Sequence, residues 1–168
     1  MRYALLLLCF CSCTYALSKP IDLPKMGLRL CPPSGWVWEK FPTKHVFKPK
    51  DWTKEPRPTI TVQAIPTEME LDSFMAADFR ENIVKYEGFA PKSREQFMPG
   101  DDYDWGFNSW TYIRPDGLKM FVYRRYYELP EYVTTVTIEA TEKDWARNHS
   151  LFEDFLNSIV VLVPKNKE

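Results

Sequence analysis

Histidine side chains are scarce in this sequence. Histidine, the commonest general base, occurs only twice, as His45 and His149. His45 lies in a proline-rich segment with Lys44 and Lys48 nearby, and His149 falls on the expected packing face of a C-terminal helix. No serine sits in the glycine motif of a nucleophile elbow, so neither histidine completes a Ser–His pair. We therefore predict a non-enzymatic protein with no catalytic residues.

An acidic cluster, Asp101-Asp102-Tyr103-Asp104, has the residue types of a calcium-binding loop. It lacks the glycine and the distal glutamate that an EF-hand loop needs to close around the ion. Aspartate also favours turns by itself, and this cluster follows Pro99-Gly100. The interpretation is a solvated turn, with no metal site and no cofactor.

A run of aromatic and basic residues, Tyr123-Arg124-Arg125-Tyr126-Tyr127, is the most suggestive surface feature. In a strand, Tyr123, Arg125 and Tyr127 would share one face, and tyrosine and arginine are frequent in protein-binding hot spots. Trp52 joins them as a candidate because it lies in an exposed proline-rich loop. The candidate interaction surface is therefore Trp52, Tyr123, Arg125 and Tyr127. The alternative, in which the tyrosines pack beneath helices, stays open.

Residues 1–16 have the layout of a secretory signal peptide. Arg2 supplies a positive start, residues 4–13 carry no charge, and Thr14-Tyr15-Ala16 place small residues at a cleavage site. An alternative is lipidation at Cys13, which follows Ser12. We expect an exported protein, either periplasmic or secreted, or else a lipoprotein tethered to a membrane.

The charge and cysteine content limit the partners and the crosslinks. Removing residues 1–16 leaves 21 basic and 23 acidic residues, so the net charge becomes 21 − 23 = −2. Without a basic stripe, nucleic acid is not an expected partner, and no further apolar stretch is long enough to span a membrane. Cys31 is the one cysteine left, either free or paired between molecules, so no internal disulfide forms.

The rest of the chain predicts one α+β domain. We expect an extended lead-in at 17–26, the domain at 27–164 and a polar tail at 165–168. Short strands are expected at 27–31, 36–39 and 45–47, and longer ones at 59–65, 103–114, 118–129 and 132–140. One helix should start with a capping box, Thr67 to Glu70, and another with Thr141. The last three long strands form an antiparallel meander, in a sheet that is antiparallel or mixed and is packed by the two main helices. A helix-grip barrel is the alternative fold.

This order of elements resembles the PsbP-like superfamily, and in particular its exported, DcrB-like branch. The resemblance rests on the early Pro33–Trp36 turn, the Ile60–Val62 strand with the helix at 71–86, the Trp110–Tyr112 strand and the closing segment at 152–159. It implies an α/β/α sandwich and a protein that works by binding other proteins. It transfers no functional residue, because the family shares no active-site motif.

We therefore expect an exported accessory factor, periplasmic or in the cell envelope, that contacts an unidentified protein partner. The alternative is a carrier of a small apolar ligand in an aromatic-lined pocket. Such a carrier should have an enclosed apolar cavity of several hundred Å³ beneath the C-terminal helix.

Overall fold

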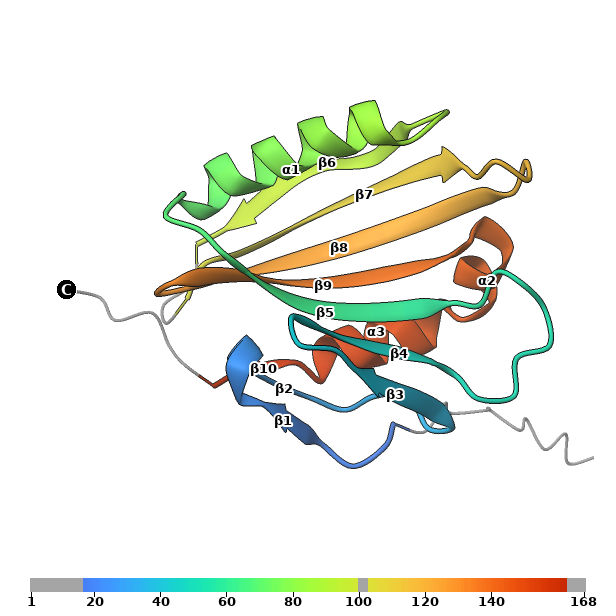
Figure 1. Cartoon of the computed structure of the whole chain (residues 1–168), viewed down its shortest axis with the longest axis horizontal. Coiled ribbons are helices and arrows are strands. Elements are labelled where there is room, and N and C mark those ends of the chain that lie inside the picture. Colours follow the sequence, from blue (N-terminus) through green and yellow to red (C-terminus); the bar gives the residue numbers. More distant parts are fainter. Residues whose placement is uncertain (1–16, 100–102, 163–168) are drawn as a thin grey trace, which may run out of the picture.

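The fold is built on one long antiparallel sheet. The computed structural model describes residues 17–99 and 103–162, and its seven-stranded sheet has the order β3-β4-β5-β9-β8-β7-β6 (Figure 1). The strands are β3 (Trp36–Lys40), β4 (Lys44–Pro49), β5 (Thr59–Pro66), β6 (Ala90–Met98), β7 (Trp105–Ile113), β8 (Lys119–Leu129) and β9 (Tyr132–Thr141). All neighbouring pairs are antiparallel. The expected meander is confirmed as β7-β8-β9.

A second, three-stranded sheet joins segments from both ends of the described chain. In it β2 (Leu28–Leu30) lies between β1 (Ile21–Leu23) and β10 (Val160–Val161). The 3-10 helix η1 (Pro24–Met26) connects β1 to β2. The expected lead-in, 17–26, thus contains β1 and η1, and Leu23 and Met26 are buried in the core. The expected signal peptide, 1–16, and polar tail, 165–168, lie outside the described residues.

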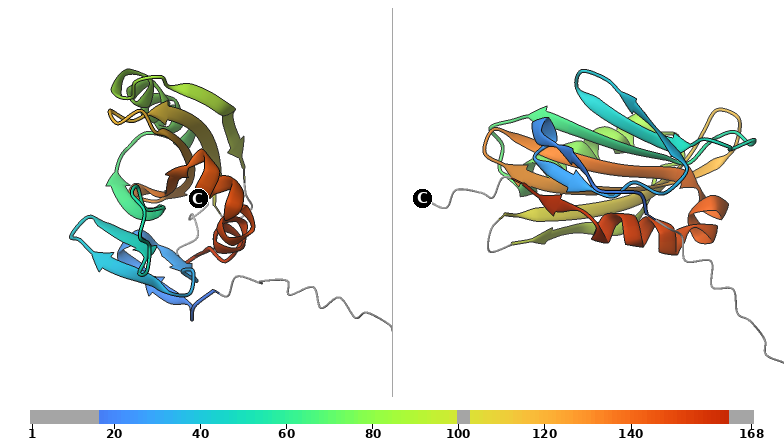
Figure 2. Two further views of the ribbon diagram at one scale, coloured as in Figure 1. Left: turned by 90° about the vertical axis from the view of Figure 1, so that its right-hand side faces the viewer. Right: turned by 90° about the horizontal axis from the view of Figure 1, so that it is seen from below.

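Helices cover both faces of the long sheet, as expected for an α/β/α sandwich. Helix α1 (Leu71–Lys85) packs on one face against β6, β7 and β8. Helices α2 (Glu142–Arg147) and α3 (His149–Asn157) lie on the opposite side (Figure 2). Phe152 and Phe155 of α3 are fully buried in the main core together with Leu28 and Leu30 of β2.

Strand β6 was not expected from the sequence. Its residues, APKSREQFM, are polar and begin next to a proline, and its pairing with β7 contains two register shifts. These are features of an edge strand, which natural sheets make irregular and polar to prevent pairing with other chains. The alternating apolar pattern that marked the other strands is therefore missing here.

The helix boundaries correct two expectations. Helix α1 begins at Leu71 with Glu70 as its N-cap and no side-chain cap, so the capping box from Thr67 is wrong. The Thr67 hydroxyl instead accepts a hydrogen bond from the Met69 amide at 3.0 Å. The expected cap at Thr141 is confirmed, because its hydroxyl accepts from the Asp144 amide at 3.0 Å. That C-terminal helix divides at Asn148 into α2 and α3.

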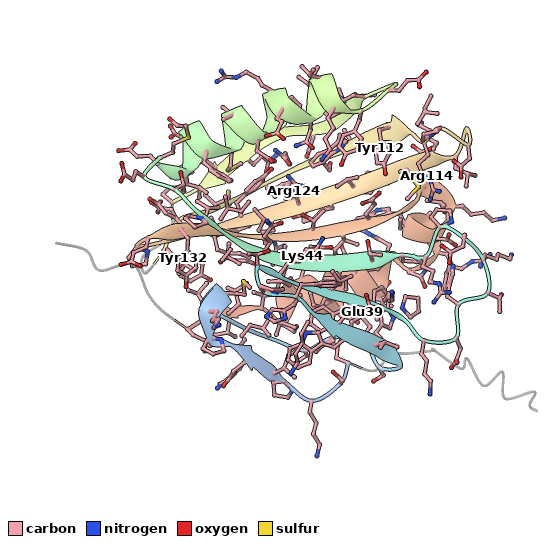
Figure 3. All side chains as sticks on the ribbon, in the orientation of Figure 1. Glu39, Lys44, Tyr112, Arg114, Arg124 and Tyr132 are labelled. Carbon is pink, nitrogen blue, oxygen red and sulfur yellow. The ribbon has the colours of Figure 1, made fainter. Side chains whose placement is uncertain are left out.

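A buried polar network fixes α1 on the sheet. Arg124 of β8 contacts both carboxylate oxygens of Asp78 of α1 at 2.7 Å. Figure 3 labels Arg124 on the strand beneath this helix. Asp78 also accepts from the Tyr126 hydroxyl at 2.6 Å, and that hydroxyl lies 3.0 Å from the Asn108 side-chain oxygen. Asn82 of α1 is buried as well, whereas the neighbouring Ile83 is 47% exposed. Because hydrogen bonds are directional, this network fixes the position of α1, which forms one wall of the cleft described next.

Candidate binding cleft

A polar strip runs along the half of the sheet that α1 leaves open. On β5 and β9 the paired residues are Thr59 with Glu139, Thr61 with Thr137, and Gln63 with Thr135. They alternate with fully buried apolar residues such as Ile60 and Ile138 that face the core. The sheet therefore presents hydroxyl, amide and carboxylate groups on this side, with Thr135 alone among the six almost fully buried, at 4% exposed.

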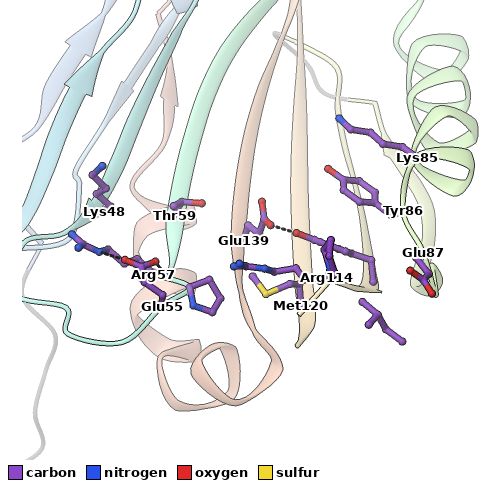
Figure 4. Close-up of a pocket in the computed structure, with 14 residues that line it drawn as sticks. Lys48, Glu55, Arg57, Thr59, Lys85, Tyr86, Glu87, Arg114, Met120 and Glu139 are labelled. Carbon is purple, nitrogen blue, oxygen red and sulfur yellow. Dashed lines mark hydrogen bonds and ion pairs between the residues drawn. The ribbon is translucent and has the colours of Figure 1, made fainter. Parts of the chain in front are cut away.

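At one end of the strip the surface is hollowed into a cleft of about 870 Å³. Its walls are the C-terminal end of α1, the turn between β7 and β8, and the loop between β4 and β5 (Figure 4). The charged and hydroxyl-bearing lining residues are Lys48, Glu55, Arg57, Thr59, Lys85, Tyr86, Glu87, Tyr112, Arg114 and Glu139. Pro56, Ile113, Pro115 and Met120 complete the lining.

The floor of the cleft is organised around a hydrogen bond from the Tyr112 hydroxyl to a carboxylate oxygen of Glu139. Tyr112 is only 8% exposed, and the ring of Tyr86 stacks on it with centroids 4.3 Å apart. Burial, helped by the bond to Glu139, raises the pKa of Tyr112 far above its usual value. Tyr112 therefore stays a donor, and the Glu139 carboxylate is held in one orientation.

The charges around the rim are mixed and largely paired. Arg57 contacts Glu55 at 2.8 Å, and Arg114 contacts Asp116 at 3.1 Å. The Lys85 ammonium lies 5.3 Å from the centroid of the Tyr86 ring. Counting the lining residues alone, four basic and three acidic side chains give 4 − 3 = +1. The cleft thus offers donors and acceptors of both signs without a strong net charge.

The lining of the cleft does not assemble the side chains of a common nucleophile–base pair or of a metal site among the described residues. Its lining contains no histidine, cysteine or serine, from which most nucleophile–base pairs are built. Within residues 17–99 and 103–162, no three side chains of His, Cys, Asp or Glu come together as a metal site. The arrangement can hold a polar ligand by hydrogen bonds and ion pairs.

The expected interaction residues do not form one surface. Tyr123 and Arg125 lie together on the opposite face of the sheet, beside α3, in a hollow of about 160 Å³ that Trp145 and His149 also line. Arg125 donates to the Leu156 carbonyl at 3.1 Å. Tyr127 has the same strand parity but is only 3% exposed, and this burial excludes it from a contact surface.

The remaining expected sites lie elsewhere. Trp52 lines a separate hollow of about 230 Å³ with Trp36 and Leu151, and Cys13 lies outside the described residues. His149, expected to pack inward, is exposed and lies 3.2 Å from Glu153. Sequence reasoning missed the cleft, although the alternating polar positions at 59–63 and 135–139 were a readable signal of an uncovered polar sheet face.

The core beneath the C-terminal helix is filled. Phe152 and Phe155 have no exposed surface, and Leu156 is 6% exposed. The hollow beside the helix is small and lined by charged residues as well as aromatic ones. Within the described residues, the space beneath α3 is therefore filled by side chains and does not form the expected apolar ligand cavity.

Comparison with known proteins identifies the fold. No protein-family model and no curated protein matches the chain. Among solved structures, cyanobacterial PsbP (CyanoP) from Synechocystis superposes with a TM-score of 0.66 over 92% of this chain and 98% of its own, at 15% identity. The chain has the PsbP-like fold.

Two further structures share this PsbP-like fold. LpqN of Mycobacterium tuberculosis, described as involved in cell envelope biogenesis, has a TM-score of 0.61 at 12% identity, covering 84% of this chain and 88% of LpqN. PA94 of Pseudomonas aeruginosa, a protein of unknown function, has a TM-score of 0.62 at 12% identity, covering 86% and 97%. These identities establish the fold alone. No described helix is long and apolar enough to cross a membrane.

Proposed function

We propose that this PsbP-like protein is an exported, non-enzymatic accessory factor of the cell envelope that holds a segment of a partner protein in the polar cleft. The observation that carries the proposal is the cleft's mixture of paired charges, hydroxyl groups and a fixed carboxylate on the surface of a sheet. The cleft, rather than the surface expected from the sequence, is the proposed contact site.

A peptide segment matches the chemistry of this cleft. Each of its residues brings an amide donor and a carbonyl acceptor, and its side chains can carry either charge. The cleft offers acceptors at Glu139 and Glu87 and donors at Lys85 and Arg114. Lys85 and Glu87 have no ion-pair partner among the residues that the structure describes, so both can pair with a ligand.

Export to the envelope is supported by the sequence of residues 1–16, with its positive start, uncharged stretch and small residues at the cut. The role of LpqN in cell envelope biogenesis provides a parallel for this location in a protein of the same fold. A tethered form, lipidated at Cys13, is compatible with the same cleft.

Site-specific photocrosslinking in the source organism tests the proposal. p-Benzoyl-phenylalanine replaces Ile113, which lines the cleft and is 41% exposed. We expect a discrete covalent adduct with one envelope protein after irradiation. The control places the same photoreactive group at Val84, which is 88% exposed on α1 and is not part of the cleft lining.

Charge reversal then tests whether the adduct depends on the cleft. Lys85→Glu combined with Arg114→Glu should abolish the adduct from position 113. Lys143→Glu combined with Arg147→Glu changes the charge equally on α2, outside the cleft lining, and should preserve it. Equal adducts from positions 113 and 84, or no adduct from position 113, would rule out the proposed site.

A further inference from the structure

A different part of the surface combines exposed aromatic rings with unpaired lysines. The turn between β3 and β4 lies beside η1 (Figure 1). We call residues 40–44, Lys40-Phe41-Pro42-Thr43-Lys44, the basic aromatic tip. A groove of about 500 Å³ runs along it, lined by Pro24, Lys25, Trp38, Phe41, Pro42 and His45 among others.

The apolar part of this region is open to solvent. Phe41 is 44% exposed at the turn, where it adjoins Pro42. Trp38 is partly exposed and stacks on Phe47 with ring centroids 5.8 Å apart, which holds its ring in place. Phe41 lies on a short turn between two strands and is not part of the core. Burying its exposed ring against an apolar partner would therefore be favourable.

The charge of this region is positive and locally uncompensated. The Lys40 ammonium lies 3.8 Å from the centroid of the Trp38 ring, and that of Lys44 lies 5.4 Å from the centroid of Phe41. Neither these two lysines nor Lys25 has a carboxylate partner within the described part of the chain. Asp22, the acidic residue of the groove lining, is paired with Arg29 at 3.0 Å. Three free positive charges thus gather here, although the whole chain has a net charge of −1.

His45 does not add to this charge at neutral pH. Its Nδ1 accepts a hydrogen bond from the Trp38 indole at 3.3 Å, which requires that nitrogen to be unprotonated. Burial and the neighbouring Lys40 both lower the pKa of His45. The positive potential of this region therefore comes from its lysines.

We propose that the basic aromatic tip docks this protein on a membrane surface rich in anionic lipid. An exposed phenylalanine can insert into the boundary between headgroups and acyl chains, and lysines within a Debye length of anionic headgroups are attracted to them. The tip supplies both from one short turn. The charge complementarity selects an anionic bilayer over a neutral one. This docking site is separate from the polar cleft and does not depend on the function proposed for it.

Vesicle cosedimentation of the full chain tests the proposal. We expect the protein to bind vesicles of phosphatidylcholine with about 30% phosphatidylglycerol and to bind vesicles of phosphatidylcholine alone far more weakly. Added salt should release it, because salt screens exposed charges. Equal binding to the two compositions would overturn the proposal, because the lysines of the tip would then contribute nothing to binding.

Variants locate the contact. Lys40→Gln with Lys44→Gln should weaken binding to the anionic vesicles about 30-fold, given the known contribution of each lysine near such a surface. Phe41→Ser should weaken it about tenfold through the lost apolar contact. The matched control is Lys50→Gln with Lys54→Gln, two exposed lysines beyond the other end of β4, which should change binding less than threefold by the same reasoning.

Two further outcomes contradict the inference. One is an equal loss of binding in the Lys50/Lys54 control. The other is that the parent chain binds no vesicles but does bind a hexaglutamate peptide, and that the Lys40/Lys44 variant loses this peptide binding. That result would assign the tip to an acidic protein instead. Thermal unfolding verifies that each variant is folded, and Lys44→Gln alone, at an exposed position, replaces the double variant if that one does not fold.

Discussion

Arg124 and Asp78 form the ion pair that joins α1 to the long sheet. The Arg124 Nη1 atom lies 2.7 Å from each carboxylate oxygen of Asp78, and the two side chains are only 18% and 16% exposed. Arg124 also donates from Nε to the Thr137 hydroxyl at 2.9 Å, so it connects the network under α1 to the polar strip. The apolar cluster beneath this helix is small, with Leu71, Met75 and Phe74 as its helix members.

Removing one partner of this ion pair should lower the free energy of unfolding substantially. Asp78→Ala leaves the Arg124 guanidinium in a largely buried position without its counter-charge, and we expect a loss of about 3–5 kcal/mol in the free energy of unfolding. Urea denaturation followed by circular dichroism measures it. Asp72→Ala, at an exposed carboxylate in the first turn of the same helix, should cost less than about 1 kcal/mol. Similar losses in the two variants would show that the ion pair is not what holds α1.

Gly106 allows α1 and β6 to approach β7 closely. A Cβ atom at this position would lie 2.8 Å from the backbone oxygen of Gln96 and would also collide with the Met75 side chain. Gly106→Ala should therefore lower the free energy of unfolding by about 1–3 kcal/mol through overpacking. Because Met75 is one of the colliding groups, Met75→Ala and Gly106→Ala together should cost less than the sum of the single variants. Strictly additive losses in urea titrations would contradict this contact.

Two threonines that look equivalent in the sequence should behave differently. Thr141→Ala removes the hydroxyl that caps α2, and we expect a loss of about 1 kcal/mol. Thr67→Ala removes a hydroxyl that bonds to the Met69 amide before α1 begins, so its effect should be below about 0.5 kcal/mol. Parallel thermal and urea unfolding of both variants compares them. A larger loss for Thr67→Ala would favour the capping box expected from the sequence.

His45 should make stability depend on pH in a defined direction. Its pKa in the folded protein is lowered by burial and by Lys40, whereas an unfolded chain has a histidine pKa of about 6.5. When the pH falls below about 6.5, the unfolded state binds the proton more readily than the folded state does. The contribution of His45 to the free energy of unfolding is therefore full above about pH 6.5 and declines below it. It levels off once the pH is below the folded pKa. The difference in unfolding free energy between the parent and His45→Gln should therefore shift against the parent between about pH 8 and pH 5. A difference that stays constant across that range would contradict the lowered pKa.

Much of the fold was predictable because its elements carry local signals. The strands β7, β8 and β9 follow each other through short turns, one of them Pro115-Asp116-Gly117, and the confirmed cap at Thr141 is a local pattern as well. Strand β6 has no such signal, because an edge strand is selected to be polar and irregular. Its pairing partner β7, and not its own composition, determines that it is a strand.

The candidate site was harder to predict from the sequence because its residues come from separate segments. Alternation along the strand correctly grouped Tyr123, Arg125 and Tyr127 on one face of the sheet. The burial of each residue, however, depends on which other elements pack against that face at its position. Tyr127 meets the core, whereas Tyr123 and Arg125 lie beside an open hollow at α3. The cleft joins a loop, a turn and a helix end, and only the packing of α1 on β6, β7 and β8 brings them around the polar strip.

The position of β2 between β1 and β10 has a consequence for synthesis. A ribosome releases residues 21–30 early and residues 160–161 late, so the edge of β2 that pairs with β10 stays open until almost the whole described chain has emerged. The Gly27 carbonyl likewise waits for its donor, the Leu162 amide, at 2.8 Å. The three-stranded sheet therefore closes only after translation has passed residue 162, which leaves this part of the nascent chain incompletely folded while the preceding residues are being made.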